Sequence, residues 1–478
     1  MFLSRNVTLS SRPAGRSTAL SLAALCLGAT ALAGGAGTAL ASTITHTPLY
    51  TFHGDSANDW FGWSVSGAGD VDGDGHADLI VGAPLDDNNG NNSGSARVLS
   101  GDDGSELFEF DGDSANDWFG GSVGGAGDVD GDGKADLIVG ADRDDNNGTN
   151  SGSARVLSGL DGSELFEFDG DSANDRFGWS VSGAGDVDGD DKADLIVGAY
   201  GDDPNGDLSG SARVLSGDDG SELFEFDGDS ADDVFGYSVS VAGDVDGDDK
   251  ADLIVGAYLD DNNGNASGSA RVLSGDDGTI LHTFDGDSAN DWFGRSVSGA
   301  GDVDGDDKAD LIVGAYGDDP NGSNSGSARV LSGDDGTILH TFNGDDANDQ
   351  FGYSVSGAGD INGDGFADLI VGAFRDDNNG SNSGSARVLS GLDGSELYEF
   401  NGDGADDEFG SSVSGAGDVN GDGIADFIVG ARYGGANGGG YARVFVSNVT
   451  GEDGADVPAP GALALLAAGL AALRLVRR

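Results

Sequence analysis

Residues 61–83 read FGWSVSGAGDVDGDGHADLIVGA and contain two apolar segments on either side of a loop of aspartate and glycine. In the first segment, Phe61, Trp63 and Val65 alternate with glycine and serine, which is the period-two pattern of a strand. The second segment has a continuous apolar run at 79–81, as expected of a strand that is buried on both faces. The stretch therefore predicts two neighbouring β-strands joined by an acidic loop.

This stretch begins a unit that recurs seven times at a fixed interval of 58 residues. Each unit is expected to contain four strands, which in the first unit are 61–68, 77–83, 95–99 and 106–110. Four-stranded units in tandem predict an all-β chain folded as a seven-bladed β-propeller, because such blades pack radially around a channel. A parallel β-helix is the rival fold, but its repeats are usually much shorter. The Phe-Gly pair that marks each unit stands at Phe61, Phe119, Phe177, Phe235, Phe293, Phe351 and Phe409.

The two ends of the array predict that the N-terminal strand closes the ring by completing blade seven. The seventh unit supplies strands at 409–417, 425–431 and 441–446 and then stops without a fourth strand. Residues 49–55 match residues 107–113 of the first unit, so they form a fourth strand with no unit before it. A closed ring removes the exposed sheet edges that an open array would carry.

Residues 1–41 have the features of a secretory signal peptide. Three arginines form a basic start, 20–33 is an apolar segment, and Ala41 ends a small-residue cleavage motif. A retained membrane anchor is the alternative, but the apolar segment is short and is followed by several glycines. The only cysteine of the chain lies in this segment, so the secreted protein is expected to contain no disulfide. The propeller is then expected to span 42–447 and to be followed by a linker at 448–457.

Residues 458–478 resemble the PEP-CTERM sorting tail of Gram-negative bacteria. A Pro-Ala-Pro motif is followed by an apolar segment at 461–473 and a basic terminus, although Ala459 stands where that family usually has glutamate. In the family a membrane peptidase of the exosortase type removes the tail, and the substrates are usually linked to an extracellular polysaccharide matrix. The resemblance implies transient membrane association through the tail and exosortase-type processing. It also implies a secreted or cell-surface location in the extracellular matrix of a Gram-negative bacterium, with a plain C-terminal membrane anchor as the alternative.

The charge of the chain argues against polyanionic partners. The sequence has 86 Asp+Glu against 22 Lys+Arg, which gives a formal net charge of −64 at pH 7. A chain this acidic repels nucleic acid and anionic lipid instead of neutralising their phosphates. We therefore expect no nucleic-acid partner.

The acidic loop between the first two strands of every unit, which we call the carboxylate loop, is a candidate calcium site. In the first unit it runs from Asp70 to Asp78, and we number its residues 1 to 9. Side-chain oxygens at positions 1, 3 and 5, the backbone carbonyl at position 7 and the carboxylate at position 9 can converge on one cation, much as in an EF-hand loop. Hard oxygen ligands suit Ca²⁺, whereas zinc and copper favour histidine and cysteine, and Mg²⁺ resists losing its water.

We expect up to seven Ca²⁺ ions, one per blade. The expected ligands, in the order 1, 3, 5, 7 and 9, are Asp70, Asp72, Asp74, His76 and Asp78; Asp128, Asp130, Asp132, Lys134 and Asp136; Asp186, Asp188, Asp190, Lys192 and Asp194; Asp244, Asp246, Asp248, Lys250 and Asp252; Asp302, Asp304, Asp306, Lys308 and Asp310; Asp360, Asn362, Asp364, Phe366 and Asp368; and Asp418, Asn420, Asp422, Ile424 and Asp426.

Two positions of the carboxylate loop vary between units. Position 6 is glycine in four units but is Asp191, Asp249 and Asp307 in units three to five. Because aspartate tolerates a left-handed backbone less well than glycine, these three loops are expected to bind somewhat differently. All four lysines of the chain stand at position 7, where the backbone carbonyl is the expected ligand. Their ammonium groups are expected to offset negative charge without contacting the metal.

These motifs together resemble the FG-GAP repeat of the integrin α-subunit propeller. The resemblance rests on the Phe-Gly pair, the Asp-x-Asp-x-Asp loop and the Val-Gly-Ala-Pro run at 81–84, and it covers about 48–446. It implies a seven-bladed propeller with calcium in the loops between the first and second strands of blades. In integrins only some blades carry such loops, whereas here every blade does. The family also implies adhesion or ligand binding, as an inference from fold to function.

The face opposite the carboxylate loops is the candidate ligand surface. Successive loops of a meander alternate between faces, so this face carries the inter-blade loops, such as 112–118, and the long loops between second and third strands, such as 86–92. Binding sites favour loops on a rigid scaffold. The alternative is that its variable side chains only pack between blades. The residues that vary at one repeat position on this face are Trp60, Trp118, Arg176, Val234, Trp292, Gln350 and Glu408.

No catalytic site is expected. Histidines are few, and His282 and His340 stand where other units have phenylalanine. Carboxylates are abundant enough for a glycosidase pair, but near-identical repeats offer few positions for one asymmetric site. An arginine recurs in every third strand and is expected to form a structural ion pair. We predict a calcium-binding adhesion module that binds an extracellular polysaccharide or a protein ligand. A purely structural calcium-dependent matrix scaffold and an extracellular hydrolase are the alternatives.

Overall fold

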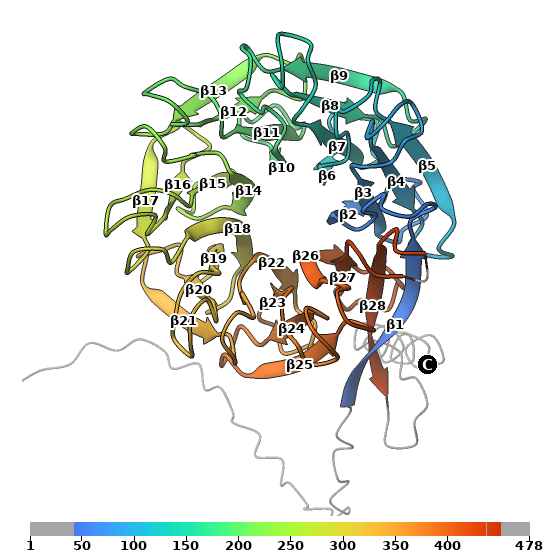
Figure 1. Cartoon of the computed structure of the whole chain (residues 1–478), viewed down its shortest axis with the longest axis vertical. Coiled ribbons are helices and arrows are strands. Elements are labelled where there is room, and N and C mark those ends of the chain that lie inside the picture. Colours follow the sequence, from blue (N-terminus) through green and yellow to red (C-terminus); the bar gives the residue numbers. More distant parts are fainter. Residues whose placement is uncertain (1–42, 436, 451–478) are drawn as a thin grey trace, which may run out of the picture. The chain divides into compact units, whose positions relative to one another are not determined.

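The computed structural model describes residues 43–435 and 437–450, and every regular element in them is a β-strand. The 28 strands form seven four-stranded sheets. The sheets are arranged as blades around a central axis (Figure 1). The seven-bladed β-propeller predicted from the repeat is confirmed. The signal peptide and sorting tail predicted at 1–41 and 458–478 lie outside the described residues. Within the described part, no helix has the length and hydrophobicity needed to cross a membrane.

The strands of a blade pair antiparallel in chain order, starting from the axis (Figure 1). Blade one consists of β2 (Ser64–Gly69), β3 (Asp78–Ala83), β4 (Ser95–Leu99) and β5 (Glu106–Asp111). Blades two to six repeat this order with β6 (Ser122–Gly127), β7 (Asp136–Ala141), β8 (Ser153–Leu157) and β9 (Glu164–Asp169); β10 (Ser180–Gly185), β11 (Asp194–Ala199), β12 (Ser211–Leu215) and β13 (Glu222–Asp227); β14 (Ser238–Gly243), β15 (Asp252–Ala257), β16 (Ser269–Leu273) and β17 (Ile280–Asp285); β18 (Phe293–Gly301), β19 (Asp310–Ala315), β20 (Ser327–Leu331) and β21 (Ile338–Asn343); and β22 (Ser354–Gly359), β23 (Asp368–Ala373), β24 (Ser385–Leu389) and β25 (Glu396–Asn401).

The N-terminal strand completes the seventh blade, as predicted. Blade seven combines β26 (Phe409–Gly417), β27 (Asp426–Ala431) and β28 (Tyr441–Thr450) with β1 (Thr43–His53). β1 and β28 pair antiparallel along their whole length and lie side by side in Figure 1. β28 extends three residues into the range 448–457, which was predicted to be a linker.

The inner strands of most blades begin later than predicted, because the Phe-Gly pair lies within a turn. Gly62 has a φ of 86°, and the Trp63 N–H donates to the Trp60 carbonyl at 2.9 Å. β2 therefore begins at Ser64. As a result the predicted alternation of Phe61 with Trp63 on one strand face is wrong. Phe61 is fully buried between blades, whereas Trp63 lies at one end of the axial channel.

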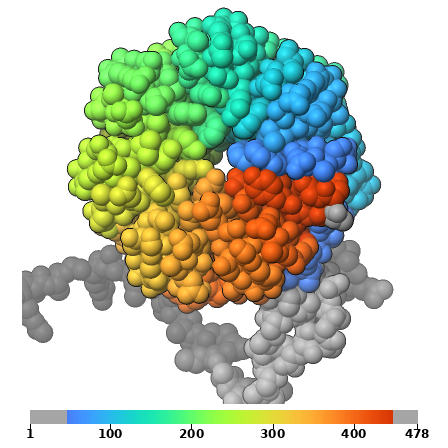
Figure 2. Space-filling model, in the orientation of Figure 1, coloured from blue at the N-terminus to red at the C-terminus, as the bar shows by residue number. Residues whose placement is uncertain are grey.

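The hydrophobic core lies between neighbouring blades. Ile80 and Val98 of blade one, for example, pack in one cluster with Phe119 and Leu137 of blade two. Every residue of β3 is buried, as its continuous apolar run predicted. The blades pack against one another around the axis (Figure 2). Because each blade completes the core of the next, a single blade cannot bury its own apolar faces.

The glycines of the repeat mark a close approach of backbones between blades. A Cβ atom on Gly82 would lie 2.0 Å from the carbonyl oxygen of Gly120. A Cβ atom on Gly120 would lie 2.2 Å from the carbonyl oxygen of Ser95, and Gly120 also has a φ of 82°. Only glycine fits such positions, which explains why the Phe-Gly and Val-Gly-Ala motifs recur in each unit.

A closed ring of hydrogen bonds links the seven inner strands. The Val123 N–H donates to Ser64 Oγ of the preceding blade at 3.1 Å, and the other blades repeat this bond. The Val65 N–H donates to Ser412 Oγ at 3.1 Å in the same way. Blade seven is therefore joined to blade one by the same bond that joins every other pair.

The recurring arginine of the third strands forms the predicted ion pair. The Arg213 guanidinium lies 2.8 Å from the Asp171 carboxylate of the preceding inter-blade loop and 5.0 Å over the ring of Phe177. The six equivalent arginines make the same kind of pair. This arginine thus covers the buried phenylalanine of the repeat and fixes the loop that enters its blade.

Candidate functional site

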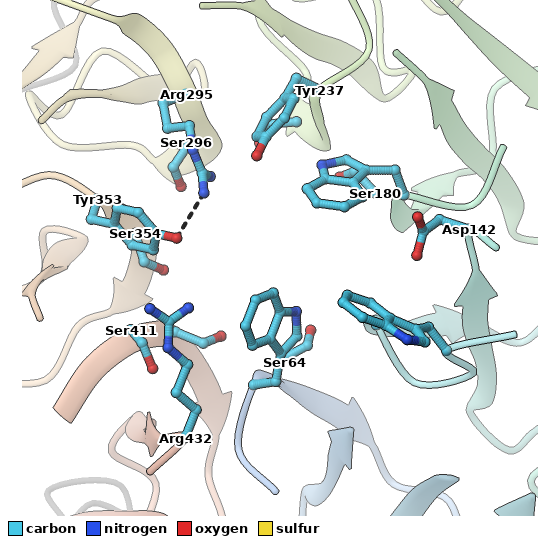
Figure 3. Close-up of a pocket in the computed structure, with 16 residues that line it drawn as sticks. Ser64, Asp142, Ser180, Tyr237, Arg295, Ser296, Tyr353, Ser354, Ser411 and Arg432 are labelled. Atoms are coloured by element: carbon cyan, nitrogen blue, oxygen red, sulfur yellow. Dashed lines mark hydrogen bonds between the residues drawn. The ribbon is translucent and has the colours of Figure 1, made fainter. Parts of the chain in front are cut away.

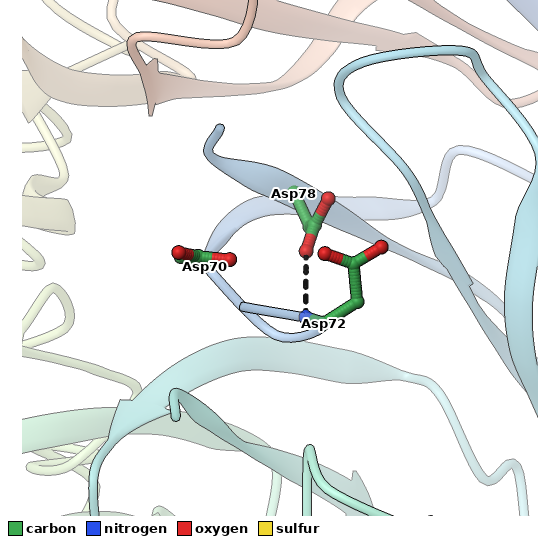
Figure 4. Close-up of side chains that lie close together, drawn as sticks. All are labelled: Asp70, Asp72 and Asp78. Carbon is green, nitrogen blue, oxygen red and sulfur yellow. Dashed lines mark hydrogen bonds between the residues drawn. The ribbon is translucent and has the colours of Figure 1, made fainter. Parts of the chain in front are cut away.

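The carboxylate loop of each blade folds over its own side chains. In blade one the Asp70 carboxylate accepts the N–H groups of Gly73 at 2.7 Å and Gly75 at 3.0 Å. Figure 4 shows Asp70, Asp72 and Asp78 gathered across this loop. Backbone donors therefore preshape the loop and direct its carboxylates toward one another.

The carboxylate at position 9 is buried and accepts hydrogen bonds on both oxygens. In blade three one Asp194 oxygen accepts the Val187 N–H at 2.8 Å, and the other accepts the Gly217 N–H at 2.9 Å. Gly217 belongs to the turn between third and fourth strands, so this carboxylate ties the loop to that turn. Burial raises the pKa of the equivalent carboxyls, to about 6 in Asp252 and about 7 in Asp426. A bound cation would favour their charged form.

Five of the seven loops bring three carboxylate oxygens within 4.8 Å of one another. In blades six and seven, asparagine replaces aspartate at position 3, so an amide oxygen takes the place of one carboxylate. The donors are oxygen atoms throughout, and such a set fits a hard divalent cation and does not fit zinc or copper. The clusters are Asp70, Asp72 and Asp78; Asp128, Asp130 and Asp136; Asp186, Asp188 and Asp194; Asp244, Asp246 and Asp248; and Asp302, Asp304 and Asp306.

Position 6 keeps one backbone conformation whichever residue occupies it. The three aspartates at this position all have a φ of 69°, in the left-handed region that Gly75 also adopts with 93°. The Asp191 N–H donates to Asp186 at 3.0 Å, as the Gly75 N–H donates to Asp70. A Cβ atom on Gly75 would meet no atom within 4 Å. The difference in binding predicted for these three loops therefore has no counterpart in their backbone.

The lysines at position 7 reach carboxylates outside the clusters. Lys192 Nζ lies 2.8 Å from the Asp218 carboxylate in the turn between third and fourth strands, and two other lysines make the equivalent pair. Blade two has Leu160 at that turn position, and Lys134 Nζ instead donates to the Asp72 carbonyl of the preceding loop at 2.8 Å. The ammonium groups thus offset negative charge beside the clusters, as expected.

Where position 7 is not lysine, its side chain lies against the preceding loop or is buried. A ring nitrogen of His76 lies 3.1 Å from the Val419 carbonyl of blade seven. A Cβ atom on Gly305 would lie 2.7 Å from the ring of Phe366. Ile424 is buried. His76 and Phe366 therefore contact the carboxylate loop of the preceding blade.

The opposite end of the channel holds a pocket of about 160 Å³, which we call the axial pocket (Figure 3). Every blade contributes to its lining. Six blades do so through the serine at the start of the inner strand, and blade two does so through Trp118, Gly121 and Asp142. In Figure 3, Arg295, Tyr353 and Arg432 lie on one side and Asp142 lies on the other. The pocket is therefore asymmetric although the repeats around it are nearly identical.

The asymmetry comes from four repeat positions, those of Trp60, Trp63, Pro84 and Leu85, which we call the mouth positions. The positions of Trp63 and Pro84 flank the paired ends of β2 and β3 and so meet beside the axis. The equivalents of Trp63 are Gly121, Trp179, Tyr237, Arg295, Tyr353 and Ser411. The equivalents of Pro84 are Asp142, Tyr200, Tyr258, Tyr316, Phe374 and Arg432.

Arg295 makes one side of the axial pocket electropositive, whereas Arg432 on the same side is paired with Glu408. The Arg295 guanidinium donates to the Tyr353 hydroxyl at 2.8 Å and lies 4.6 Å from the ring centre of Tyr237 and 4.4 Å from that of Tyr353. Burial raises the pKa of the Tyr353 phenol, but the guanidiniums of Arg295 and Arg432 outweigh it and leave the pKa below its usual value. This side of the pocket therefore favours negative charge.

On the other side, Asp142 is neutralised by arginines. Its carboxylate lies 2.9 Å from Arg176 and 4.0 Å from Arg143. Burial raises the pKa of the Asp142 carboxyl, against the attraction of these two guanidiniums. Asp142 therefore adds little net negative charge to the pocket.

Seven residues at the Trp60 position vary between blades on the face that was expected to bind the ligand, and they contribute unequally to the lining of the axial pocket. Of the seven, only Trp118 is in the pocket lining. Trp60 stacks on Trp63 with ring centres 4.9 Å apart, and Trp292 stacks on Tyr316 at 4.7 Å. Packing between neighbouring side chains is thus their main role.

The four other side chains at the Trp60 position are either paired with an opposite charge or buried. Arg176 pairs with Asp142, and Glu408 lies 2.5 Å from Arg432. Val234 and Gln350 are buried. The position therefore supports the pocket from behind and forms no continuous exposed ligand surface.

Sequence reasoning did not identify the positions of Trp63 and Pro84, which line the axial pocket most directly. The signal was present in the repeat. When the seven units are superposed on their Phe-Gly pairs, both positions carry different residue types, the first between an invariant glycine and an invariant serine and the second directly after an invariant alanine. Their meeting at one point of the axis is a property of the closed ring.

Fold and loops together define a seven-bladed β-propeller with an oxygen-rich loop in every blade. The chain belongs to the FG-GAP repeat family, whose model matches residues 61–99, 119–157, 177–215, 235–273, 293–331, 351–389 and 409–445.

The chain is also similar to integrin α subunits. It is 32% identical to integrin alpha-5 of Xenopus laevis over 220 residues, which is 41% of this chain and 20% of that protein. It is 30% identical to integrin alpha-V of Gallus gallus over 220 residues, with the same coverage. It is 30% identical to integrin alpha-PS2 of Drosophila melanogaster over 212 residues, which is 40% of this chain and 15% of that protein. The match thus spans a fifth or less of the length of these relatives.

Proposed function

We propose that this protein is a calcium-dependent β-propeller that binds a ligand outside the cell, as an adhesion module. The observation that supports the proposal is that the two ends of the ring differ in how strictly they repeat from blade to blade. One end repeats the same oxygen-rich loop in every blade, and the other end brings residues that differ between blades together in one pocket. Membership of the FG-GAP family and the similarity to integrin α subunits agree with a ligand-binding role.

Calcium would be held by positions 1, 3, 5 and 9 of each carboxylate loop together with the carbonyl at position 7. When bound, it would neutralise carboxylates that otherwise repel one another. The chain itself contributes the preshaped loop, the buried position 9 carboxylate and the position 7 side chains that link neighbouring loops. The proposed role of the metal is therefore to stiffen the ring that supports the axial pocket.

The proposed site of action is the extracellular polysaccharide matrix of a Gram-negative bacterium. The signal peptide at 1–41 would direct secretion. The tail at 458–478 would allow transient membrane association until an exosortase-type peptidase removes it. The ligand would be a matrix polysaccharide or a matrix protein. These proposals rest on the sequence of the two ends.

The test compares binding of the full-length chain to isolated extracellular matrix fractions in calcium and in EDTA. Binding in calcium that is lost in EDTA is expected. A second arm uses Trp118→Ala, which changes the pocket lining, and Leu160→Ala, which shortens an exposed side chain at the carboxylate-loop end. A ligand-binding protein is impaired by the first change and not by the second. A pure scaffold, which the near-identity of the blades favours, is indifferent to both.

A further inference from the structure

The basic residues of the repeat region fall into two groups. Sixteen of the 22 Lys+Arg lie between the two terminal segments, and eleven of these occupy two repeated positions, in the third strands and at loop position 7. Ten of the eleven pair with a carboxylate. The other five all occupy mouth positions: Arg143, Arg176, Arg295, Arg375 and Arg432. In this strongly acidic repeat region, every arginine outside the two repeated positions is thus at one end of the channel.

Arg295 is the member of this group that faces the axial pocket without a counterion. Its guanidinium is held by Tyr237 and Tyr353, and among the described residues no carboxylate oxygen lies within 4.0 Å of it. A guanidinium has five N–H donors in a planar fork that matches a carboxylate. The bond to the Tyr353 hydroxyl uses only part of this capacity.

Further donors line the same pocket as Arg295. The hydroxyl of Ser411 is buried in the pocket wall and has no hydrogen-bond partner within the described part of the chain. The inner-strand serines, such as Ser296 and Ser354, accept a backbone N–H and keep their own O–H group to donate. A buried donor without an acceptor is costly, so a ligand that supplies an acceptor would be stabilised here.

The remaining walls are aromatic, and the space is small. Trp63, Trp118, Trp179 and Tyr237 line the pocket, and a cavity of about 160 Å³ is close to the size that accommodates one six-membered ring. Aromatic rings offer flat apolar faces to the C–H face of a sugar ring. A small acidic side chain of a peptide would leave most of these faces uncovered.

We propose that the axial pocket binds one carboxylated pyranose, the terminal uronate unit of an acidic polysaccharide, with its carboxylate on Arg295. This inference deepens the proposed function and rests on it, since it names the ligand class of the same module. Arg432 and Ser411 lie beside the carboxylate position, and the tryptophans contact the ring. Asp142, already held by Arg176 and Arg143, lies across the pocket and accepts a sugar hydroxyl.

Only the end of a polysaccharide chain enters the pocket. The net charge of −64 repels an extended polyanion from the rest of the surface. At physiological salt the Debye length is about 8 Å, so contacts inside the pocket decide the binding of a single terminal carboxylate. The site therefore selects chain ends and not the middle of an acidic polymer.

The test is calorimetric titration of the full-length chain in calcium at 150 mM salt, with methyl glucuronide and methyl galacturonide as probes. Uronate binding is expected, with at least about tenfold weaker binding of the methyl esters and of methyl glucoside, because each lacks the charged acceptor. Arg295→Gln is expected to lose at least about tenfold in affinity, whereas Arg375→Gln, which removes a mouth arginine outside the pocket lining, stays within about twofold. Equal losses in the two variants, or equal binding of the neutral glycoside, overturn the proposal.

Two further arms keep the outcome decisive. If Arg295→Gln does not fold, Ser411→Ala removes one pocket donor with little change in volume and is expected to weaken uronate binding about threefold. A capped glutamate peptide that binds in place of the sugar assigns the pocket to a protein ligand and overturns the proposal. If Arg295→Gln retains wild-type binding to matrix polysaccharide, the adhesion function stands and the pocket assignment fails. If the wild type binds methyl uronides but no matrix fraction, the pocket assignment stands and the adhesion function fails.

Discussion

The two ends of the propeller axis are built from the same repeat and have diverged in opposite ways. At one end, seven carboxylate loops are nearly identical in sequence and conformation. At the other end, the mouth positions carry tryptophan, tyrosine, arginine, glycine, serine, aspartate and glutamate in different blades. The first end carries the aspartates of the seven loops, with a lysine at position 7 in four of them. The second end collects the five arginines of the repeat region that stand outside its repeated positions.

This difference separates two tasks within one blade. A residue that serves each blade, such as Asp194, or each junction between blades, such as Gly120, is needed seven times and is repeated seven times. A residue that serves the single pocket on the axis is needed once, so its equivalents are free to differ. The strands between the two ends stay invariant because the core between blades requires them at every junction.

Removal of calcium should give the largest effect and should act on the repeated end. Each loop occupied at a free calcium concentration 100-fold above its Kd stabilises the fold by about 2.7 kcal/mol. We therefore expect EDTA to lower the melting temperature strongly, as measured by calorimetry on the full chain. Magnesium added back in excess is the control and should restore little. A melting curve unchanged by EDTA would contradict structural calcium.

Asp194→Asn should be the most harmful single change at the repeated end. The Asp194 carboxylate accepts one backbone N–H on each oxygen. Asparagine keeps one oxygen, but its amide nitrogen cannot accept the second N–H. The expected cost is about 1–3 kcal/mol of unfolding free energy even in EDTA, measured by urea unfolding. Asp190→Asn is the matched control, because Asp190 is exposed and its bond to the Lys192 N–H is retained by an amide oxygen. Equal effects of the two changes would refute a special role for position 9.

Acidification of the metal-free protein should remove the unfavourable negative charge of the buried Asp233 carboxylate, which precedes Val234 at a mouth position. Burial, with Asp260 nearby, raises the pKa of the Asp233 carboxyl to about 6. Between the ordinary pKa of an aspartate and this raised pKa, the carboxyl is ionised in the unfolded chain but still protonated in the folded protein. The free energy of unfolding is therefore higher below about pH 4 and falls as the pH rises through about 6. Asp233→Asn keeps an acceptor for the Ser230 N–H and removes the charge, so it should stabilise the protein by about 1 kcal/mol at pH 7 and little at pH 4. Urea unfolding in EDTA across this range measures the difference, and a pH-independent gap would argue against it.

Loss of a position 7 ion pair should have the smallest effect. Lys192→Gln removes a largely exposed pair with Asp218 and should lower the free energy of unfolding only slightly, and less in high salt. Lys134→Gln is the control, since Lys134 contacts a carbonyl where Leu160 replaces the acidic partner. Chemical unfolding at low and high salt separates the two. A salt-independent loss for Lys192→Gln would show that its alkyl chain, and not its charge, matters.

The parts of the fold that follow from local pattern could be predicted from the sequence. Strand number, blade number and ring closure depend on the 58-residue period and on the unmatched strands at its ends. The carboxylate loops were also visible, because their candidate ligands lie within nine consecutive residues. The direction of the Trp63 side chain could not be predicted from the sequence, because the turn at Gly62 breaks the alternation that predicted a shared face with Phe61.

By itself, then, the sequence determined the seven blades, the acidic loops and the strand that closes the ring, because each depends on neighbours along the chain. Only the tertiary structure decided that Arg295, Tyr353, Ser411 and Asp142 meet in one pocket. These residues are separated by one or more whole repeats, and a constant period carries no information about which side chains face the axis. Closure of the ring brings equivalent positions of all blades to one point, where their differences combine into a single asymmetric site.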